Sequence, residues 1–107
     1  RGRFDAGVCS LALHHIEDVD ALLARFRDLL KPGGTLCLVD LDPDGGEFHP
    51  DNTGVFHFGF ERAELQRTLA TLGFGTIQCS TATSVARPIA SGALRTFPMF
   101  LIVGRKG

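Results

Sequence analysis

Cysteine, net charge and long apolar runs are all scarce in this sequence, and each shortage excludes a class of protein. The three cysteines, Cys9, Cys37 and Cys79, form no C-x-x-C pair, which argues against a disulfide framework or a zinc site. All three lie in apolar or strand-like runs, so we expect small buried hydrophobic side chains in a reducing cytoplasm. The formal net charge is −1, which gives no reason to expect nucleic acid or a membrane surface as a partner.

No apolar run reaches the length of about 20 residues that a helix needs to span a bilayer. The chain also does not open on the basic and apolar segments of a signal peptide. What it does contain is ordinary for one soluble domain, since 44% of its 107 residues are hydrophobic and 21% are charged. Because Arg1 leads directly into a strand-like run, we expect the chain to be a portion of a longer protein.

The N-terminal part of the sequence has the pattern strand, helix, strand. Residues 4–13 are small and apolar without alternation, which is typical of a parallel strand covered on both faces. Apolar residues of 19–30 recur at helical period, with Asp18 as the expected N-cap and Lys-Pro-Gly-Gly at 31–34 as the stop. A second apolar run at 35–41 completes the pattern of a parallel βαβ unit.

The remainder contains a long connection, a helix and two strands. Residues 42–59 hold glycines and acidic residues together with three phenylalanines and two histidines. A connection of this length in a small domain is typical of a functional lid or a mobile segment. A helix is expected at about 61–72. Residues 76–85 alternate as a strand with one exposed face, 87–97 have the composition of a loop, and 98–103 predict a last buried strand.

Three motifs of the βαβ unit resemble the class I S-adenosylmethionine-dependent methyltransferases. They are Phe4-Asp5, Leu13-His14-His15 and Leu30-Lys31-Pro32-Gly33-Gly34-Thr35-Leu36. Each motif is weak alone, but the three at this spacing make a strong signal. The helix that ends in Gly73-Phe74 and the ending 98–107 are similar to that family's next helix and its seventh strand.

The resemblance implies an α/β fold and, within it, a partial Rossmann-like methyltransferase fold. Strands four to seven and their helices would be present, with the last strand antiparallel between the fifth and sixth, and the first three strands would be absent. Residues 1–107 would form the C-terminal part of a single methyltransferase domain. The subgroup most similar is the ubiquinone and menaquinone C-methyltransferase-like enzymes. The implied cofactor is S-adenosylmethionine, with S-adenosylhomocysteine as product, and the implied partner is a small-molecule methyl acceptor.

The glycine-rich cofactor turn of that family is missing. No G-x-G-x-G occurs, and Gly33-Gly34 and Gly45-Gly46 stand in a different context. Such a turn lets the backbone approach the cofactor closely, so we expect this chain alone to be inactive and to act as part of a longer enzyme. The alternative is a non-catalytic or degenerate α/β domain, whose first strand would expose an edge and favour self-association or pairing with another chain.

Ligands of doubly wound sheets bind beyond the carboxyl ends of the strands. By position in the resembling family, Ser10, Leu11, His14 and His15 would line the methionine side of the cofactor. The competing interpretation is a histidine pair that caps the helix entry and stays half-solvated, and we favour it for catalysis. His15 could serve as a general base near neutral pH. Methyl transfer to a nucleophilic acceptor requires little beyond alignment, so no catalytic residue is assigned.

Other polar residues near this edge have less specific interpretations. Asp40 ends the second strand, where it either orients the acceptor or, as we favour, is a solvated strand end. The histidines and carboxylates of the long connection show no recognised metal spacing, so we expect a solvated loop and no metal. The phenylalanines of this connection would form an apolar acceptor wall or simply bury the loop. The polar loop residues are His49, His57, Asp42, Asp44, Glu47 and Asp51.

Overall fold

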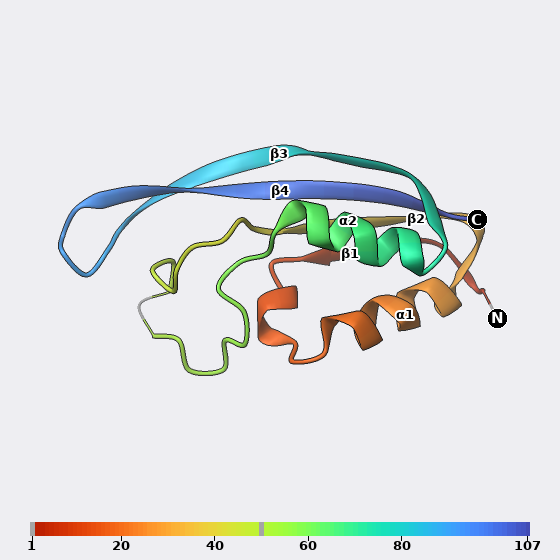
Figure 1. Cartoon of the computed structure of the whole chain (residues 1–107), viewed down its shortest axis with the longest axis horizontal. Coiled ribbons are helices and arrows are strands. Elements are labelled where there is room, and N and C mark those ends of the chain that lie inside the picture. Colours follow the sequence, from red (N-terminus) through yellow and green to blue (C-terminus); the bar gives the residue numbers. More distant parts are fainter. Residues whose placement is uncertain (1, 50) are drawn as a thin grey trace.

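The chain forms one mixed sheet with two helices, as Figure 1 shows for the computed structural model, which describes residues 2–49 and 51–107. Within these residues the strand order is β1-β2-β4-β3. Strand β1 pairs parallel with β2, and β4 runs antiparallel to both β2 and β3. The expected α/β arrangement, with the last strand inserted antiparallel, is therefore confirmed. The elements are β1 (Phe4–Ser10), the 3-10 turn η1 (Leu13–His15), α1 (Val19–Leu29), β2 (Leu30–Leu41), α2 (Arg62–Thr71), β3 (Phe74–Pro88) and β4 (Leu94–Lys106).

The βαβ unit forms as its local sequence predicts. Asp18 caps α1, because its carboxylate accepts a hydrogen bond of 3.0 Å from the backbone N–H of Ala21. The apolar stripe of α1 faces the sheet, and Leu23 is fully buried there. At Leu30 the backbone becomes extended and ends the helix. The unit thus places the ends of β1 and β2 side by side at one edge of the sheet.

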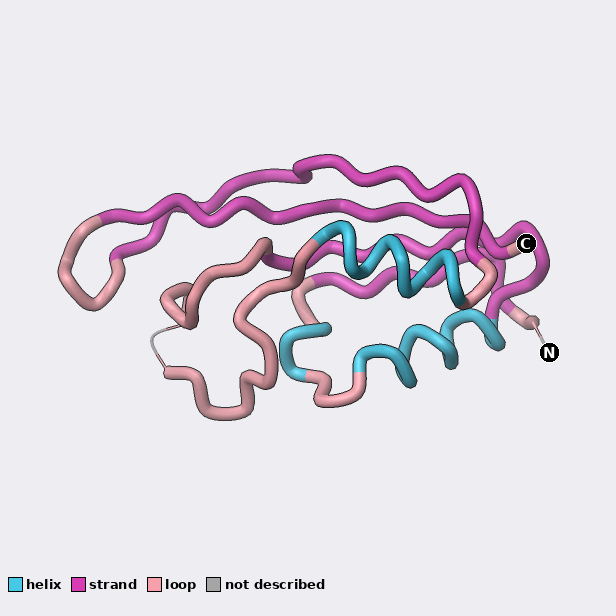
Figure 2. The backbone as a smooth tube through the Cα atoms, viewed as in Figure 1, coloured by secondary structure: helices cyan, strands magenta, loops and turns pink. Residues whose placement is uncertain are grey.

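Both helices cover the same face of the sheet (Figure 2), since α1, α2 and one face of β2 contribute to a single core. On β2, Leu36 and Leu38 are fully buried in that core, whereas Cys37 and Val39 on the opposite face are only half-buried. Val8 of β1 is 67% exposed. The expectation of a strand covered on both faces is therefore wrong for the described residues, because neither helix lies on the second face.

The strands β3 and β4 extend into a hairpin that projects past the end of β2. Pairing continues as far as Pro88 opposite Leu94, so the predicted loop at 87–97 is wrong except at the turn between these two residues. Proline is tolerated here because β3 is an edge strand. We call residues 84–98 the hairpin arm. It makes the molecule elongated, with extents of 48 × 25 × 20 Å.

A second, smaller core joins the long connection to the hairpin arm. Phe48 of the connection packs with Leu41, Phe97 and Met99, and Val85 lies against them. We call residues 42–59 the acceptor loop, after the role proposed below. Because Phe48 is buried in this second core, it packs the acceptor loop against the rest of the protein.

The two ends of the acceptor loop are held together. The backbone N–H of Asp44 donates to the carbonyl of Phe58 at 2.9 Å, and that of Phe60 donates to Leu41 at 2.9 Å. Gly59 lies between them with a φ of 86°, and a side chain there would overlap the carbonyl of Asp42. Glycine is thus required where the loop rejoins the sheet.

The three cysteines are free, and they differ in burial. Cys9 is buried, whereas Cys37 and Cys79 are half-buried. Burial raises the pKa of the Cys9 thiol, and the nearby Asp40 carboxylate adds to the shift. This thiol is therefore inert at neutral pH. Neither helix in the described residues has the length and apolar character needed to cross a membrane.

Candidate functional site

Asp40 lies at the carboxyl end of β2 and is fully buried. Its carboxylate accepts hydrogen bonds from the backbone N–H groups of Leu41 at 2.8 Å and Leu13 at 3.1 Å. A third contact of 3.0 Å joins it to Nδ1 of His14. The interpretation of Asp40 as a solvated strand end is therefore wrong, because η1 folds over the end of β2 and covers the carboxylate with donors.

The contact with Asp40 orients the imidazole of His14. An ionised carboxylate can only accept, so Nδ1 of His14 is the donor and Nε2 of the neutral ring is the basic nitrogen. His14 is 3% exposed, whereas His15 beside it is exposed. The interpretation of a half-solvated histidine pair thus fails for His14. The carboxylate thus fixes both the orientation of the His14 ring and its tautomer.

Ser10 and Leu11 lie at the end of β1, next to this pair. Ser10 is exposed and pairs with Val39 of β2. Leu11 has a φ of 55°, and its N–H donates to the carbonyl of Val39 at 2.7 Å. A left-handed conformation is rare for leucine and costs about 1–3 kcal/mol. The structure therefore brings the four residues expected at the cofactor, from Ser10 to His15, to the same edge as Asp40.

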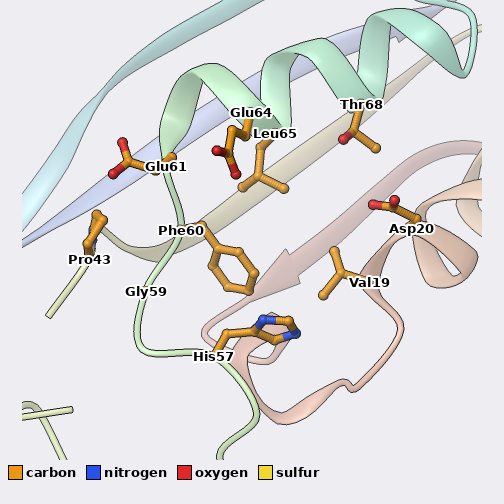
Figure 3. Close-up of a pocket in the computed structure, with 10 residues that line it drawn as sticks. All are labelled: Val19, Asp20, Pro43, His57, Gly59, Phe60, Glu61, Glu64, Leu65 and Thr68. Carbon is orange, nitrogen blue, oxygen red and sulfur yellow. The ribbon is translucent and has the colours of Figure 1, made fainter. Parts of the chain in front are cut away.

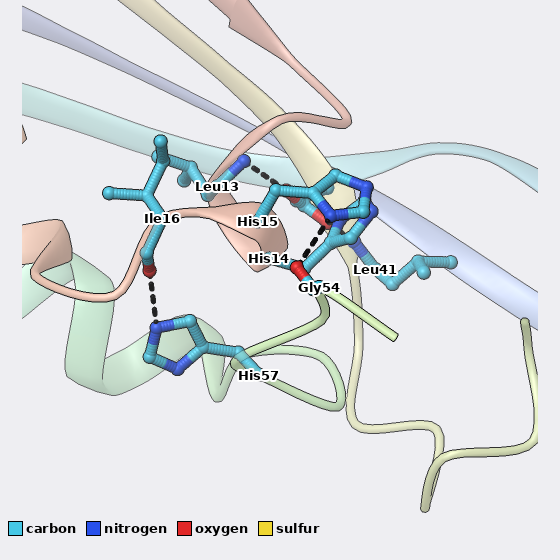
Figure 4. A network of polar contacts seen from close by, with 8 residues as sticks. Leu13, His14, His15, Ile16, Leu41, Gly54 and His57 are labelled. Atoms are coloured by element: carbon cyan, nitrogen blue, oxygen red, sulfur yellow. Dashed lines mark hydrogen bonds and ion pairs between the residues drawn. The ribbon is translucent and has the colours of Figure 1, made fainter. Parts of the chain in front are cut away.

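The acceptor loop closes over this edge through backbone and histidine contacts. The N–H of Phe56 donates to the carbonyl of His14 at 2.8 Å, and Nδ1 of His15 donates to the carbonyl of Gly54 at 3.0 Å. Nε2 of His57 donates to the carbonyl of Ile16 at 2.8 Å (Figure 4). The segment after β1 and the acceptor loop are thus fastened together, although they lie far apart in the sequence.

The ring of His49, from the acceptor loop, packs at a tilt against the rings of His14 and His15. Its ring centroid lies 4.8 Å from that of His14 and 5.9 Å from that of His15. Nε2 of His49 is buried and is the one buried side-chain nitrogen or oxygen of the described residues that lacks a hydrogen-bond partner. Burial lowers the pKa of His49, and the neighbouring His14 and His15 add to the effect. The ring is therefore neutral at neutral pH.

The loop carboxylates are engaged by arginines and by backbone. Arg62 of α2 binds Asp42 with two hydrogen bonds of 2.7 and 2.8 Å, and this contact raises the pKa of the guanidinium. Arg95 of β4 pairs with Glu47, and the buried Asp44 accepts from the N–H of Gly46 at 2.7 Å. The interpretation of a solvated loop is therefore wrong for this part. Across residues 2–49 and 51–107, no three His, Cys, Asp or Glu side chains are grouped to hold a metal.

A pocket of about 430 Å³ lies between α1, α2 and the end of the acceptor loop (Figure 3). Its wall includes the carboxylates of Asp20, Glu61 and Glu64 and the ring of His57. None of the four residues expected at the cofactor lines it. This pocket therefore lies apart from the His14–Asp40 pair.

Sequence reasoning missed the partnership of Asp40 with His14 and the position of His49. A signal for the first was present, because the carboxyl ends of neighbouring parallel strands meet at one edge. An aspartate at the end of β2 and histidines after β1 are therefore placed within reach of each other. For His49 the sequence held no comparable signal, since its position depends on how the acceptor loop packs.

Comparison with known proteins supports the family resemblance. Residues 1–38 match the family model described as a methyltransferase domain. An uncharacterized methyltransferase of Schizosaccharomyces pombe is 44% identical over 63 residues, which are 52% of this chain and 22% of the relative. A highly reducing polyketide synthase of Aspergillus luteorubrus is 35% identical over 91 residues, which are 74% of this chain and 3% of the relative. The chain thus spans a small part of the length of these relatives.

Solved structures show the same fold. Phosphoethanolamine N-methyltransferase 2 of Haemonchus contortus, in complex with S-adenosyl-L-methionine, has a TM-score of 0.70 at 15% identity over 96% of this chain and 33% of that chain. The YcgJ protein of Bacillus subtilis has a TM-score of 0.71 at 17% identity over 96% of this chain and 64% of that chain.

The narrower grouping with ubiquinone and menaquinone C-methyltransferases stays a prediction. The broader similarity rests on three findings that agree, which are the family model over residues 1–38, a relative named a methyltransferase and the sheet order. In the sequence of its first 38 residues and in its fold, this chain is similar to the class I S-adenosylmethionine-dependent methyltransferases.

Proposed function

We propose that this chain forms the acceptor side of an enzyme that transfers a methyl group from S-adenosylmethionine to a small molecule. Residues 1–107 would be the C-terminal part of a single methyltransferase domain in a longer, cytoplasmic enzyme, and inactive alone. The observation that carries this proposal is the buried His14–Asp40 pair at the carboxyl edge of two parallel strands. This edge is where doubly wound sheets bind their ligands.

In this proposal, Ser10, Leu11, His14 and His15 line the methionine side of the cofactor. Leu11 supports this role, since its side chain is 38% exposed and its backbone is held in a strained conformation beside the pair. Strained backbone is concentrated at ligand sites, where the surrounding structure maintains it. An apolar side chain in this position offers a contact surface for the methylene groups of a methionine.

In the proposed reaction, the protein mainly aligns the acceptor with the methyl group and takes up a proton from the acceptor. When bound, the cofactor supplies an electrophilic methyl group on a positively charged sulfur. An acceptor that carries a proton on the attacking atom must lose it, and Nε2 of His14 is the nitrogen available to take it. Asp40 then stabilises the positive imidazole through the 3.0 Å contact with Nδ1. The acceptor loop covers the edge and excludes water from the transfer.

The test is binding of S-adenosylhomocysteine, measured by isothermal titration calorimetry on this chain and on the product of the whole open reading frame that encodes it. We expect binding by the whole product and little by the chain alone. In the whole product, Leu11→Asp should weaken the binding of S-adenosylhomocysteine roughly tenfold or more, because it places a charge against an apolar contact. Leu94→Asp is the matched control, since Leu94 is an exposed leucine at the turn of the hairpin arm. Absence of binding by the whole product would refute the proposal.

A second candidate function is a non-catalytic domain that pairs through β1. It is favoured by one observation, which is that β1 forms the edge of the sheet in the described residues and leaves Val8 67% exposed. An open strand edge beside an uncovered apolar face favours pairing with another chain.

A further inference from the structure

Two arginines lie directly opposite each other on the hairpin arm. Arg87 of β3 pairs with Arg95 of β4 in the strand register. Their guanidinium groups also lie over neighbouring rings, with Arg87 at 4.4 Å from the centre of Phe48 and Arg95 at 4.8 Å from that of Phe97. These two rings contact each other edge to face at 5.2 Å. Like charges opposite each other in a sheet are unfavourable, so negative charge nearby stabilises this arrangement.

The protein supplies that charge to Arg95 but not to Arg87. Arg95 pairs with Glu47 and donates to the backbone carbonyl of Asp44 at 2.8 Å. The Asp44 carboxylate is nearly buried and accepts from the N–H of Gly46. Within the part of the chain that the structure describes, no hydrogen bond or ion pair engages the guanidinium of the half-buried Arg87. Its ring contact with Phe48 leaves the N–H groups at the edge of the guanidinium available.

A second unused polar group lies beside Phe48. The ring of His49 contacts that of Phe48 at 4.9 Å, and its buried Nε2 has no partner. Arg87 and His49 thus both contact the ring of Phe48, the guanidinium at 4.4 Å and the imidazole at 4.9 Å from its centre. A neutral imidazole that carries its proton on Nε2 can donate one hydrogen bond from that atom. A buried polar atom without a partner is unfavourable unless a ligand or water completes it.

We propose that Arg87 and His49 bind an oxyanionic group, a phosphate or a carboxylate, on the methyl acceptor. The planar guanidinium matches two oxygens of such a group, and Nε2 of His49 supplies a further donor. The bound anion would also neutralise the repulsion between Arg87 and Arg95. Assigning the anion to the acceptor rests on the function proposed above, and follows from the contact of His49 with the ring of His14 at 4.8 Å.

Nuclear magnetic resonance of the arginine and histidine side chains tests the site directly on this chain. Inorganic phosphate is added at neutral pH and constant ionic strength, and acetate is added in a parallel titration. We expect saturable shifts at Arg87 and His49. Arg87→Gln should weaken phosphate binding roughly tenfold or more, since charge-assisted hydrogen bonds are lost. Arg87→Lys keeps the charge without the planar fork and should weaken it less. Tighter phosphate or tighter acetate binding indicates which oxyanion the acceptor carries.

Arg105→Gln is the matched control, because Arg105 is a β4 arginine that contacts the carbonyl of Gly33 at the opposite end of the sheet. It should bind phosphate as the unchanged chain does. Equal losses in Arg105→Gln and Arg87→Gln would indicate general surface attraction and overturn the site, as would an absence of saturable binding. Phosphate binding together with failure of S-adenosylhomocysteine binding by the whole product would overturn only the assignment to a methyl acceptor.

Discussion

At the scale of single residues, the carboxylate of Asp40 connects the sheet to the candidate site. It is fully buried and has hydrogen-bond contacts with three groups. We expect Asp40→Asn to lower the free energy of unfolding by about 2 kcal/mol, because buried hydrogen bonds to a charged acceptor are lost. Urea denaturation measures this value.

Asp28→Asn is the control for Asp40→Asn, because the side chain of Asp28 is 67% exposed. It should change the free energy of unfolding by no more than about 0.5 kcal/mol. Equal effects of the two substitutions would mean that the Asp40 carboxylate does not hold η1 on the end of β2.

The lowered pKa of His49 predicts a dependence of stability on pH. Its ordinary pKa is 6.5, and burial with two neighbouring imidazoles lowers it in the folded chain. As the pH falls below 6.5, the unfolded chain takes up a proton at this residue before the folded chain does, so stability is lost. His49→Gln has no such group. We expect the unfolding free energy of the original chain, relative to His49→Gln, to fall from neutral to mildly acidic pH. A constant difference would contradict the assignment.

At the scale of elements, the acceptor loop and the hairpin arm behave as one unit because Phe48 joins them. Phe48→Ala removes the ring that contacts both Phe97 and Arg87. We expect a loss of about 3 kcal/mol, in the range of buried phenylalanine truncations. Hydrogen exchange should increase at the amides of Phe56 and His57, which both donate to the carbonyl of His14.

Phe58→Ala is the control for this element, since the ring of Phe58 is 48% exposed. In Phe58→Ala, the amides of Phe56 and His57 should keep most of their protection from hydrogen exchange. If Phe48→Ala left the loop amides as protected as Phe58→Ala does, the second core would not be what holds the acceptor loop in place.

At the scale of the whole molecule, the uncovered face and open edge of β1 predict self-association. Val8 is 67% exposed on this strand, and Phe4 is 52% exposed. Val8→Lys should raise the dissociation constant of a dimer roughly tenfold, because a charge on an edge strand opposes pairing. Analytical ultracentrifugation over a range of concentrations measures it. Leu94→Lys, at an exposed leucine of the hairpin arm, should leave association unchanged, and a monomer at every concentration would refute the prediction.

Features that are determined by neighbouring residues could be predicted from the sequence, whereas features that depend on residues distant in the sequence could not. The helix α1 and its cap at Asp18 could be predicted, because neighbouring residues determine them. The positions of Ser10 to His15 at the end of β1 also follow from the strand pattern, although their contact with cofactor stays a prediction. The burial of Asp40 could not be predicted from local pattern, because its partner His14 lies 26 residues away. Pro88 indicated a loop, since proline breaks most strands but not an edge strand.

The closed base of the acceptor loop has a consequence for divergence within the family. Gly59 and the hydrogen bonds of Asp44 and Phe60 fasten the two ends of the loop to the sheet, independently of what lies between them. A loop whose ends are already joined can be lengthened at small cost, about 0.6 kcal/mol for each doubling of its length. Insertions that leave Phe48 in the second core are therefore tolerated by the folded sheet. Relatives with the same sheet are therefore expected to differ in the length of this segment more than in the strands that hold its ends.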